Sequence, residues 1–404
     1  MSKQILEGSR AVAETIKLCK PDVISAYPIT PQTHIVEDLA KFKADGKADY
    51  EYVRAESEFA AASIALGASA TGSRVYTATS SQGLLLMAEV VYNIAGMRLP
   101  VIMTCANRAV SAPINIWNDH QDAMAVRDAG WVMLFAENVQ EAVDMHIMAF
   151  KIAETVKIPV MVNIDGFILT HTYEPVEIPS DVFVKKFIGK YKPAKGEYLD
   201  VDNPRTFGAF ASPADYQGIR EQLQDDIMES KQLINETAKK YYNQVNALQK
   251  LQNSNFKTNA MDSGLIEYVG SQDAEVVIVA MGSVVGTIRH AVQEMCLVDK
   301  IPLNPLLKKG ENNVGILKIK SFRPFPNEEI RKVLKNAKFV AVLEKAISLG
   351  NEGILAGEIK QVLCGTGIKV KSYIGGLGGR DVTREMVKFM VKDVKKNNLK
   401  VRFV

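Results

Sequence analysis

The chain has 404 residues, of which 47% are hydrophobic and 24% are charged. This composition supports two ordinary globular domains with sizeable cores and argues against a disordered chain. The 49 lysine and arginine residues exceed the 46 aspartate and glutamate residues by only three, a net charge of +3. Because this balance offers no large basic field to a phosphate backbone, we expect no nucleic-acid partner.

The N-terminal residues Met1–Glu7 lack the basic-then-apolar order of a secretion signal. No apolar run approaches the roughly 18 residues that span a bilayer. We therefore expect a cytoplasmic protein without a membrane partner. The four cysteines, Cys19, Cys105, Cys296 and Cys364, are far apart and have no paired spacing. This predicts buried, reduced thiols rather than a disulfide framework, a zinc site or an iron–sulfur cluster.

Between residues 23 and 165, strand-like apolar runs alternate with segments of helical length. This alternation predicts a doubly wound α/β domain, in which helices cover both faces of a parallel sheet. Asn138, followed three residues later by Glu141, predicts a capping box at the start of the last helix. The expected strands are Val23–Ile29, Val75–Ser80, Val101–Ala106, Trp131–Ala136 and Pro159–Ile164, and the expected helices are Glu58–Ala70, Leu84–Ala95 and Gln140–Glu154.

The alternation stops between residues 174 and 212, where prolines and glycines are frequent, and we expect an extended excursion across the surface. From Ala214 to about Leu251, polar residues surround apolar ones at helical spacing. This predicts one long solvent-facing helix or two packed helices, which we interpret as a connector. The spaced apolar residues are Ile219, Leu223, Ile227 and Leu233.

A second alternating unit begins near Glu275 and predicts a smaller doubly wound domain. The lysine-rich end from Lys388 to Lys400 predicts a solvated helix face, with a docking patch for an acidic electron carrier as the alternative. These features predict units at 1–212, 213–258 and 259–404. The expected strands are Val276–Met281, Gly315–Ile319, Phe339–Leu343 and Val370–Ile374, with helices near 285–297, 327–336 and 352–363.

Three short segments stand where strand-like runs of the first unit end. Strand ends that share one edge of an open parallel sheet line a crevice. A hydroxyl, a carboxylate and a guanidinium carried there can converge on one small molecule. The segments are Ala26-Tyr27-Pro28-Ile29-Thr30-Pro31, Glu56-Ser57-Glu58 and Asn107-Arg108-Ala109.

Together with Ser80–Met87 and Ala112–Asp122, these segments resemble the alpha subunits of pyruvate:ferredoxin oxidoreductases, within the 2-oxoacid:ferredoxin oxidoreductase family. The resemblance continues through Ser321–Pro326 and Gly375–Asp381, so it covers nearly the whole chain. It implies a thiamine-diphosphate-fold domain of the pyrimidine-binding type, followed by a smaller transketolase-C-terminal-like domain. The sequence contains neither the Gly-Asp-Gly…Asn segment of thiamine enzymes nor a cysteine set for iron–sulfur clusters.

The resemblance therefore implies half of an active site for thiamine diphosphate. A beta subunit would supply the diphosphate side with Mg²⁺, and gamma and delta subunits would complete an enzyme whose [4Fe-4S] clusters lie outside this chain. The implied reaction converts pyruvate, coenzyme A and oxidised ferredoxin into acetyl-CoA, carbon dioxide and reduced ferredoxin. Branched-chain or other 2-oxoacids are alternative substrates. A non-catalytic scaffold of thiamine-fold ancestry and a nicotinamide-binding Rossmann protein are more remote alternatives.

By this resemblance, Glu58 is the catalytic glutamate. A carboxylic acid that hydrogen-bonds a ring nitrogen of the aminopyrimidine shifts the exocyclic amine to an imine, which can remove the thiazolium proton. Glu56 is the neighbouring alternative, but two positions along a helix start turn a side chain away from the crevice. Taken alone, Glu58 is also explained as a carboxylate that stabilises a helix N-terminus.

Arg108 and Thr30 are the expected substrate-binding and catalytic partners of Glu58. Arg108 matches the family's substrate arginine, since a guanidinium binds a 2-oxoacid carboxylate through two parallel hydrogen bonds. Arg98 and Arg127 are alternatives that we expect on helix or loop surfaces. The Thr30 hydroxyl would donate a hydrogen bond to the substrate carbonyl oxygen as negative charge develops on that oxygen. Its local interpretation is the cap of the following helix.

The remaining expected cofactor-binding residues flank this set. Pro28 and Ile29 belong to the stiff loop before Thr30. Ser81, Gln82 and Gly83 resemble the family's crevice wall, where Gly83 permits close approach, although a plain strand-to-helix turn also explains them.

Two further motifs carry no expected chemistry. We interpret Asn118–Asp122 as structural, because its histidine lacks the spacing of a metal site. Gly375–Gly379 follows a strand, but the Gly-x-Gly-x-x-Gly pattern of a nucleotide-binding loop is absent. We therefore expect a turn near a subunit contact there, and no metal ligand in this chain.

Overall fold

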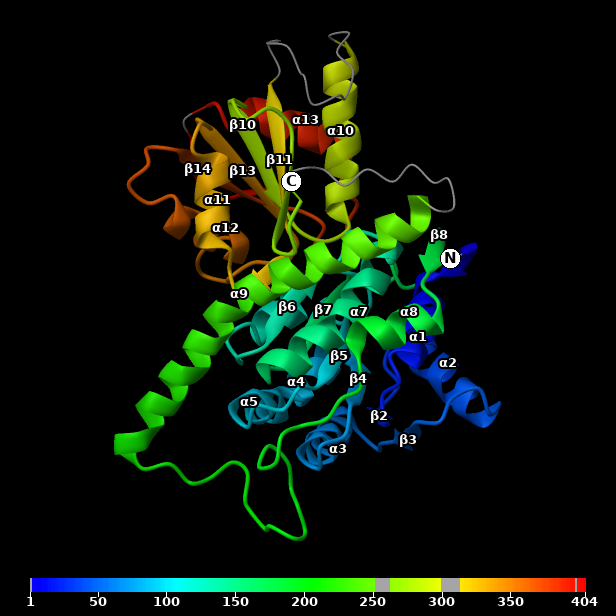
Figure 1. Ribbon diagram of the computed structural model, residues 1–404. Helices are drawn as coiled ribbons and strands as arrows, with labels where there is room; N and C mark the ends of the chain where they lie inside the picture. The colour runs from blue at the N-terminus through cyan, green and yellow to red at the C-terminus, as the bar shows by residue number, and fades with distance from the viewer. Residues whose placement is uncertain (1, 251–261, 299–312, 397) are drawn as a thin grey trace.

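The computed structural model describes residues 2–250, 262–298, 313–396 and 398–404. A seven-stranded sheet organises the first unit, with the strand order β12-β6-β7-β5-β4-β2-β3 (Figure 1). The six strands from β2 to β7 are parallel to their neighbours, and only β12 runs antiparallel, beside β6. The seven strands are β2 (Val23–Ala26), β3 (Glu51–Arg54), β4 (Val75–Thr79), β5 (Ile102–Asn107), β6 (Val132–Phe135), β7 (Val160–Asp165) and β12 (Ser321–Arg323).

Two groups of helices accompany this sheet. α3 packs on β2 and β4 and contacts α4 and α5, whereas α1 contacts α2, α7 and α8, and α7 packs on β5 and β7. The parallel, doubly wound arrangement predicted from the alternation is therefore confirmed. The helices are α1 (Gly8–Leu18), α2 (Thr33–Ala44), α3 (Glu58–Ala70), α4 (Ser81–Leu86), α5 (Ala88–Gly96), α6 (Gln121–Ala125), α7 (Val139–Val156) and α8 (Asp181–Ile188).

The strand order places a topological switch point at β2. β2 pairs with β3 on one side and with β4 on the other, so the chain leaves β2 in one direction and returns on its opposite side. Ligands of open α/β sheets bind at the carboxyl ends of the strands at such a point. The segments that follow β2, β3 and β4 therefore define the position of a crevice.

For most of the helices and strands expected in the first unit, the predicted ends lie within a few residues of the observed ends. The expected helix Leu84–Ala95 is divided, since α4 ends at Leu86 and α5 begins at Ala88. The Asn138 side chain accepts the Glu141 amide at 2.9 Å and starts α7, as predicted. The reciprocal half of the capping box is absent, because the Glu141 carboxylate accepts the Glu137 amide instead, at 2.7 Å.

The prediction of an extended excursion between 174 and 212 is wrong for its first part. β8 (Tyr173–Ile178) pairs antiparallel with β1 (Ser2–Glu7), and α8 follows it. The Ser180 side chain caps α8, whose Val184, Phe187 and Ile188 are buried. Tertiary pairing with the N-terminal strand decides this structure, and no local pattern reports such a partner.

Residues Pro213–Lys250 form one helix, α9, which crosses in front of the first unit in the view of Figure 1 and contacts α7. The single-helix form of the prediction is confirmed up to Lys250, and the expected end at Leu251 lies outside the described residues. Of the apolar residues at helical spacing, Ile219 is 49% exposed and does not join the buried face of α9. The buried face of α9 comprises Leu223, Ile227, Ile234, Ala238 and Tyr241.

A six-stranded sheet, β15-β14-β13-β10-β11-β9, organises the second unit and is parallel except for β9 at one edge. All four expected strands are present. The strands are β9 (Ile266–Val269), β10 (Val276–Ala280), β11 (Val314–Ile319), β13 (Phe339–Glu344), β14 (Lys369–Ile374) and β15 (Arg402–Phe403), and the helices are α10 (Val284–Val298), α11 (Asn327–Leu334), α12 (Ile354–Val362), the short 3₁₀ helix η1 (Leu377–Gly379) and α13 (Arg384–Asp393).

The two units are joined by more than a connector. β12, whose sequence follows β11 of the second sheet, adds an edge strand to the first sheet. The ammonium group of Lys318 in β11, with a side chain 3% exposed, donates to Glu137 and Glu141 beside α7 at 2.7 and 2.8 Å. The boundaries at 212 and 258 stay a prediction, and residue 258 lies outside the described range.

Cys19 and Cys105 are buried free thiols, as expected. Cys364 is exposed, so its predicted burial is wrong, and the Cys296 side chain lies outside the described part of the chain. Of the described helices, none combines the length and the apolar character that a bilayer crossing requires.

Candidate functional site

The loop after β2 is braced by a glutamine that sequence reasoning missed. Gln32 is fully buried, and its Nε2 donates to the Ala78 carbonyl of β4 at 2.7 Å. Its Oε1 accepts the Ile29 amide at 3.3 Å. Gln32 thereby ties the Tyr27–Pro31 loop to the neighbouring strand, and this loop presents Pro28 and Thr30 as exposed residues.

Glu58 lies at the first position of α3, which begins here because the Ser57 side chain accepts the Ala60 amide at 3.1 Å. Glu58 is only 8% exposed, whereas Glu56 is exposed. Within the described part of the chain, no hydrogen bond or ion pair engages the Glu58 carboxylate. A buried carboxyl group without a partner is costly, so its position indicates a polar ligand that hydrogen-bonds with it.

Gly83 makes room for this carboxylate. A Cβ atom at Gly83 would lie 2.8 Å from both Cγ and Oε1 of Glu58 and 2.6 Å from Oγ1 of Thr79. Glu58, at the start of α3 after β3, therefore contacts the first turn of α4, which follows β4. The absence of a side chain at Gly83 is what permits this contact.

Polar atoms without partners gather beside Glu58. Oγ1 of Thr79, Oγ of Ser80 and Nε2 of Gln82 are buried and unbonded. Buried polar groups in proteins are nearly always hydrogen-bonded, so these atoms together indicate a polar ligand at the C-terminal end of β4. Donors, acceptors and an unpaired carboxylate around a glycine fit the aminopyrimidine part of thiamine diphosphate.

Arg108 follows β5 and is 8% exposed. Its Nη1 donates to the Thr30 carbonyl at 2.9 Å and its Nε to the Asn115 carbonyl at 3.1 Å. No carboxylate of the described residues pairs with its guanidinium. Burial lowers the pKa of Arg108, and the charge of Asp122 only partly opposes this effect. A buried cation that contacts only carbonyls suits an anionic ligand.

Asp122 links the parts of this site, and sequence reasoning interpreted it only as structural. Its carboxylate, fully buried, accepts the Arg108 amide at 3.0 Å, the Ser81 amide at 2.9 Å and the Asn107 side-chain amide at 3.0 Å. Ser81 has a φ of 46°, which is strained for a residue with a side chain, so these bonds hold it in place. The Ser81 hydroxyl also donates to Ala109 at 2.5 Å.

These contacts connect Thr30, Glu58, Ser81–Gly83 and Arg108 into one arc around the ends of β2, β4 and β5. The alternative arginines lie elsewhere. Arg98 pairs with Asp226 of α9, and Arg127 donates to the Met124 carbonyl at 2.8 Å. The structure therefore brings the four segments to one edge of the sheet, and the convergence of their side chains on one small molecule stays a prediction.

A second buried network lies between the two sheets. His120 Nε2 and Lys345 Nζ lie 2.6 and 2.8 Å from the two oxygens of Asp165, at the end of β7. Burial alone raises the pKa of Asp165, but Lys345 and His120 outweigh it and hold that pKa far below its usual range. Since Lys345 follows β13, this network fixes the two units to each other, and sequence spacing gave no sign of it.

The glycine-rich turn belongs to the same interface. The amides of Gly378 and Gly379 donate to Asp119 Oδ2 at 3.2 Å and to the Asn118 carbonyl at 2.7 Å. The turn thus packs on the Asn115–Asp119 loop of the first unit. Burial raises the pKa of Asp119 to about 6. These bonds give Asn118, Asp119 and the Gly378–Gly379 turn a structural role within the chain, and the expected subunit contact near this turn stays a prediction.

Two family models match most of the chain. Residues 14–239 match the family model of pyruvate flavodoxin/ferredoxin oxidoreductase, thiamine diphosphate-binding, and residues 274–387 match pyruvate:ferredoxin oxidoreductase core domain II. The chain is 47% identical to pyruvate synthase subunit PorA of Methanosarcina barkeri, over 97% of this chain and 92% of that protein. It is 46% identical to the PorA subunit of Methanocaldococcus jannaschii, over 97% and 95%.

Other relatives carry a different substrate in their names. Ketoisovalerate oxidoreductase subunit VorA of Pyrococcus horikoshii is 40% identical, over 98% of this chain and 94% of that protein. A solved 2-oxoglutarate:ferredoxin oxidoreductase of Magnetococcus marinus shares the fold, with a TM-score of 0.68 and 21% sequence identity. The match covers 97% of the present chain and 65% of the Magnetococcus chain. The chain therefore belongs to the pyruvate flavodoxin/ferredoxin oxidoreductase family, of which it carries the thiamine diphosphate-binding domain and core domain II.

Proposed function

We propose that this chain is the alpha subunit of a thiamine-diphosphate-dependent pyruvate:ferredoxin oxidoreductase. The enzyme converts pyruvate and coenzyme A into acetyl-CoA and carbon dioxide and passes electrons to ferredoxin. The observation that carries the proposal is the unpaired, buried Glu58 carboxylate against Gly83, beside three unbonded polar atoms. The identities of 46% and 47% to two PorA subunits support the choice of pyruvate.

Each side chain has a defined role in this proposal. Thiamine diphosphate, when bound, supplies the nucleophilic carbon that attacks the 2-oxoacid. The carboxyl group of Glu58 hydrogen-bonds a ring nitrogen of the pyrimidine, while Gln82 and the Ser80 and Thr79 hydroxyls complete the polar wall. Pro28, Ile29 and Ser81 shape the loops around it.

The substrate is held from the other side of the arc. Arg108 binds the carboxylate of pyruvate, because it is a buried cation without an acidic partner among the described residues. Thr30, whose carbonyl already contacts Arg108, turns its hydroxyl toward the substrate carbonyl oxygen and stabilises the charge that develops there. Asp122 positions both Arg108 and Ser81 through their backbone amides.

The missing half of the site comes from partner subunits. The sequence has no Gly-Asp-Gly…Asn segment, so a beta subunit supplies the diphosphate side with Mg²⁺, and gamma and delta subunits, with [4Fe-4S] clusters in the partners, complete the path to ferredoxin. Relatives named as subunits support this assembly. Because coenzyme A and ferredoxin are cytoplasmic reactants, we place the enzyme in the cytoplasm.

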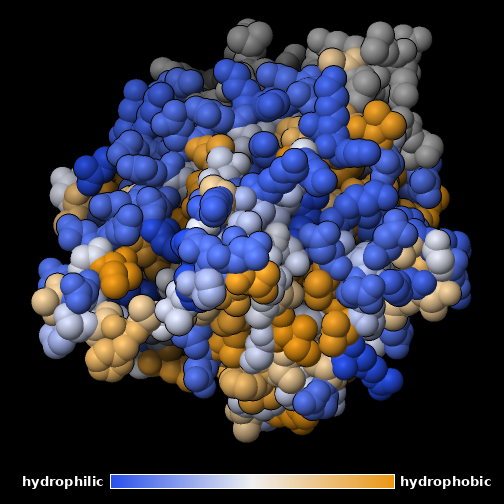
Figure 2. All heavy atoms as spheres, turned by 60° about the horizontal axis from the view of Figure 1, so that its bottom comes forward, coloured by the Kyte–Doolittle hydropathy of each residue, from blue (hydrophilic) through white to orange (hydrophobic). Residues whose placement is uncertain are grey.

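The surface beside Glu58 is suited to such a partner. Phe59, Leu86 and Tyr92, on the contacting helices α3, α4 and α5, are between 41% and 52% exposed. Figure 2 brings forward the part of the molecule where these helices lie, and apolar side chains gather in its lower half while the upper half is mostly hydrophilic. We assign this apolar face to the beta subunit, since a partner there would cover the Glu58 side of the crevice.

The second candidate function is the same reaction with a branched-chain 2-oxoacid. The relatives named ketoisovalerate oxidoreductase subunit VorA, at 40% and 41% identity, favour it over more distant activities. The groups that bind the shared 2-oxoacid moiety do not distinguish the substrates, which differ in the volume of the pocket for the side chain.

The test uses the enzyme assembled with its partner subunits. We expect carbon dioxide exchange and ferredoxin reduction with pyruvate, and loss of both by about 10²–10⁴-fold in Glu58→Gln, the effect of losing a positioned acid. Glu56→Gln, which changes an exposed glutamate two residues away, is the matched control and should keep full activity. Equal activity of the two variants would contradict the role of Glu58. A preference for 2-oxoisovalerate over pyruvate would replace the first candidate by the second.

A further inference from the structure

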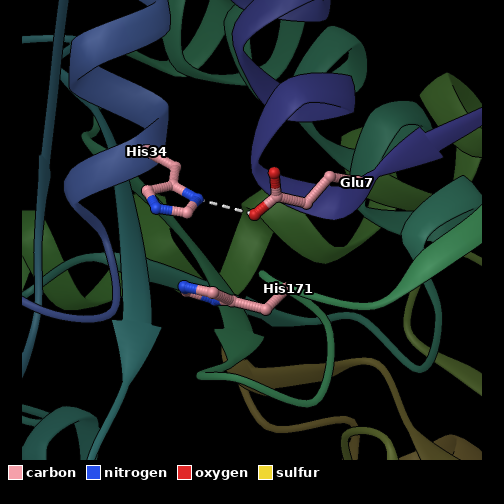
Figure 3. A group of neighbouring side chains, drawn as sticks. All are labelled: Glu7, His34 and His171. Atoms are coloured by element: carbon pink, nitrogen blue, oxygen red, sulfur yellow. Dashed lines mark hydrogen bonds and ion pairs between the residues drawn. The ribbon is translucent and has the colours of Figure 1, made fainter.

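Three side chains outside the Glu58–Arg108 arc meet at the surface of the first unit (Figure 3). Glu7 ends β1, His34 lies in the first turn of α2, and His171 lies between β7 and β8. His34 Nδ1 lies 2.7 Å from Glu7 Oε1, and one ligand atom of each residue lies within 4.8 Å of the other two. The proposed reaction uses none of these groups.

Two imidazoles and one carboxylate form a ligand set that suits Zn²⁺ better than Mg²⁺ or Ca²⁺, which prefer oxygen. With metal–ligand bonds of about 2.0–2.2 Å, tetrahedral ligand atoms lie roughly 3.4 Å apart. Around an ion, separations as long as 4.8 Å would shorten by up to about 1.4 Å, and the 2.7 Å between His34 Nδ1 and Glu7 Oε1 would lengthen by roughly 0.7 Å if both atoms bind the ion. His34, whose side chain is 47% exposed, is free to make this movement, and the same exposure admits water as a fourth ligand.

His171 is already oriented as a metal-binding histidine. Its Nδ1 lies 2.7 Å from the Thr170 hydroxyl, which itself accepts the Phe167 amide at 2.8 Å. In the tautomer whose Nδ1–H donates to the Thr170 hydroxyl, as metal-binding histidines donate to an outer partner, Nε2 is left for the ion. The His171 ring also packs between the rings of His34 and Phe167, with 4.7 Å between centroids in each pair. Figure 3 shows the His171 ring facing that of His34, with Glu7 beside His34.

We propose that Glu7, His34 and His171 bind one Zn²⁺ ion. The ion fastens three segments that are far apart in sequence: the junction of β1 and α1, the start of α2, and the loop after β7. The ion would have a structural role and would lie near the Glu58–Arg108 arc, because His34 follows by two residues Gln32, which braces the loop after β2. Phe167, which stacks on His171, also lies against Trp117, with 4.6 Å between ring centroids. The competing interpretation is an ion pair between Glu7 and His34 that binds no metal.

The test uses the purified full chain in a Cys364→Ser background, so that the exposed thiol binds no metal. After treatment with a chelator, Zn²⁺, Co²⁺ and Mg²⁺ are titrated separately, with stoichiometry, visible Co²⁺ absorption and thermal midpoint as readouts. We expect the chain to bind one equivalent of Zn²⁺ and to show a higher thermal midpoint with it. Bound Co²⁺ should give a visible absorption that Zn²⁺ removes by competition, and Mg²⁺ should change none of these readouts.

Substitutions separate the cluster from adventitious binding. His34→Ala and His171→Ala should lose the tight equivalent, and Thr170→Val should weaken it by about ten- to a hundredfold, the usual effect of removing an outer partner. His290→Ala is the matched control, because His290 pairs with Glu294 at 3.7 Å on an exposed helix face. Circular dichroism verifies that the variants fold. Absence of a tight equivalent in the parent chain, or its retention in both cluster variants, would overturn the proposal.

Discussion

Substitution of Gly83 by alanine tests the geometry around Glu58 without replacing a reactive group. Gly83 lies in α4 and has no positive φ, so alanine is compatible with its backbone. The added methyl group would lie 2.8 Å from Cγ and Oε1 of Glu58 and 2.6 Å from Oγ1 of Thr79. Ordinary contacts begin near 3.4 Å. The Glu58 carboxylate must therefore move by roughly half an ångström or more.

This displacement has a predictable magnitude. Overpacking a filled site costs about 1–3 kcal/mol of stability, which an assembled enzyme tolerates. The effect on catalysis is larger, because a misplacement of about 1 Å costs on the order of 10²-fold in rate. We expect Gly83→Ala to lower kcat for pyruvate oxidation by about 10²-fold while the subunits still assemble.

The assay is ferredoxin reduction by the assembled enzyme, with the thermal midpoint measured in parallel. Gly67→Ala is the control, since Gly67 lies in the same helix as Glu58 and a Cβ there meets nothing within 4 Å. It should raise stability by about 0.5–1 kcal/mol and leave kcat unchanged. A Gly83→Ala enzyme with wild-type kcat would refute the placement of Glu58 against Gly83 as a condition for catalysis.

Two further predictions concern charge. Arg108→Ala should raise the KM for pyruvate by about 10–100-fold, the loss of a charge-assisted hydrogen bond, and leave the KM for coenzyme A unchanged; equal changes in both values would contradict the assignment. Burial raises the pKa of Glu141, but Lys318 and Lys320 lower it from 4.5 to about 2. Because this pKa is lower in the folded chain than in the unfolded chain, ionised Glu141 stabilises the fold by about 3 kcal/mol at neutral pH. This contribution is complete above pH 4.5 and is lost as the pH falls toward 2. Glu141→Gln should lower the thermal midpoint at pH 7 and flatten that acid dependence, whereas Glu51→Gln, at a side chain 75% exposed, should change neither.

The amino-acid sequence by itself determined most of the alternating elements of both units, although α2 and β3 were not among those expected. Strands of a parallel sheet are buried on both faces, so they appear as continuous apolar runs, and β4, β5 and β7 were found in this way. Caps are equally local, as the start of α7 at Asn138 shows. The order of polar residues at strand ends also predicted the convergence of Thr30, Glu58 and Arg108, because the topology of such sheets brings those ends together.

Only the tertiary structure decided how that site is supported. Gln32 braces the loop after β2, and Asp122 joins Ser81 to Arg108, through bonds to backbone groups that leave no local pattern. β12 crosses to the first sheet, and Glu7, His34 and His171 meet from three separate segments. The physical reason is the same in each case: a contact between distant segments depends on how the chain is packed, and neither hydrophobic periodicity nor spacing along the sequence records it.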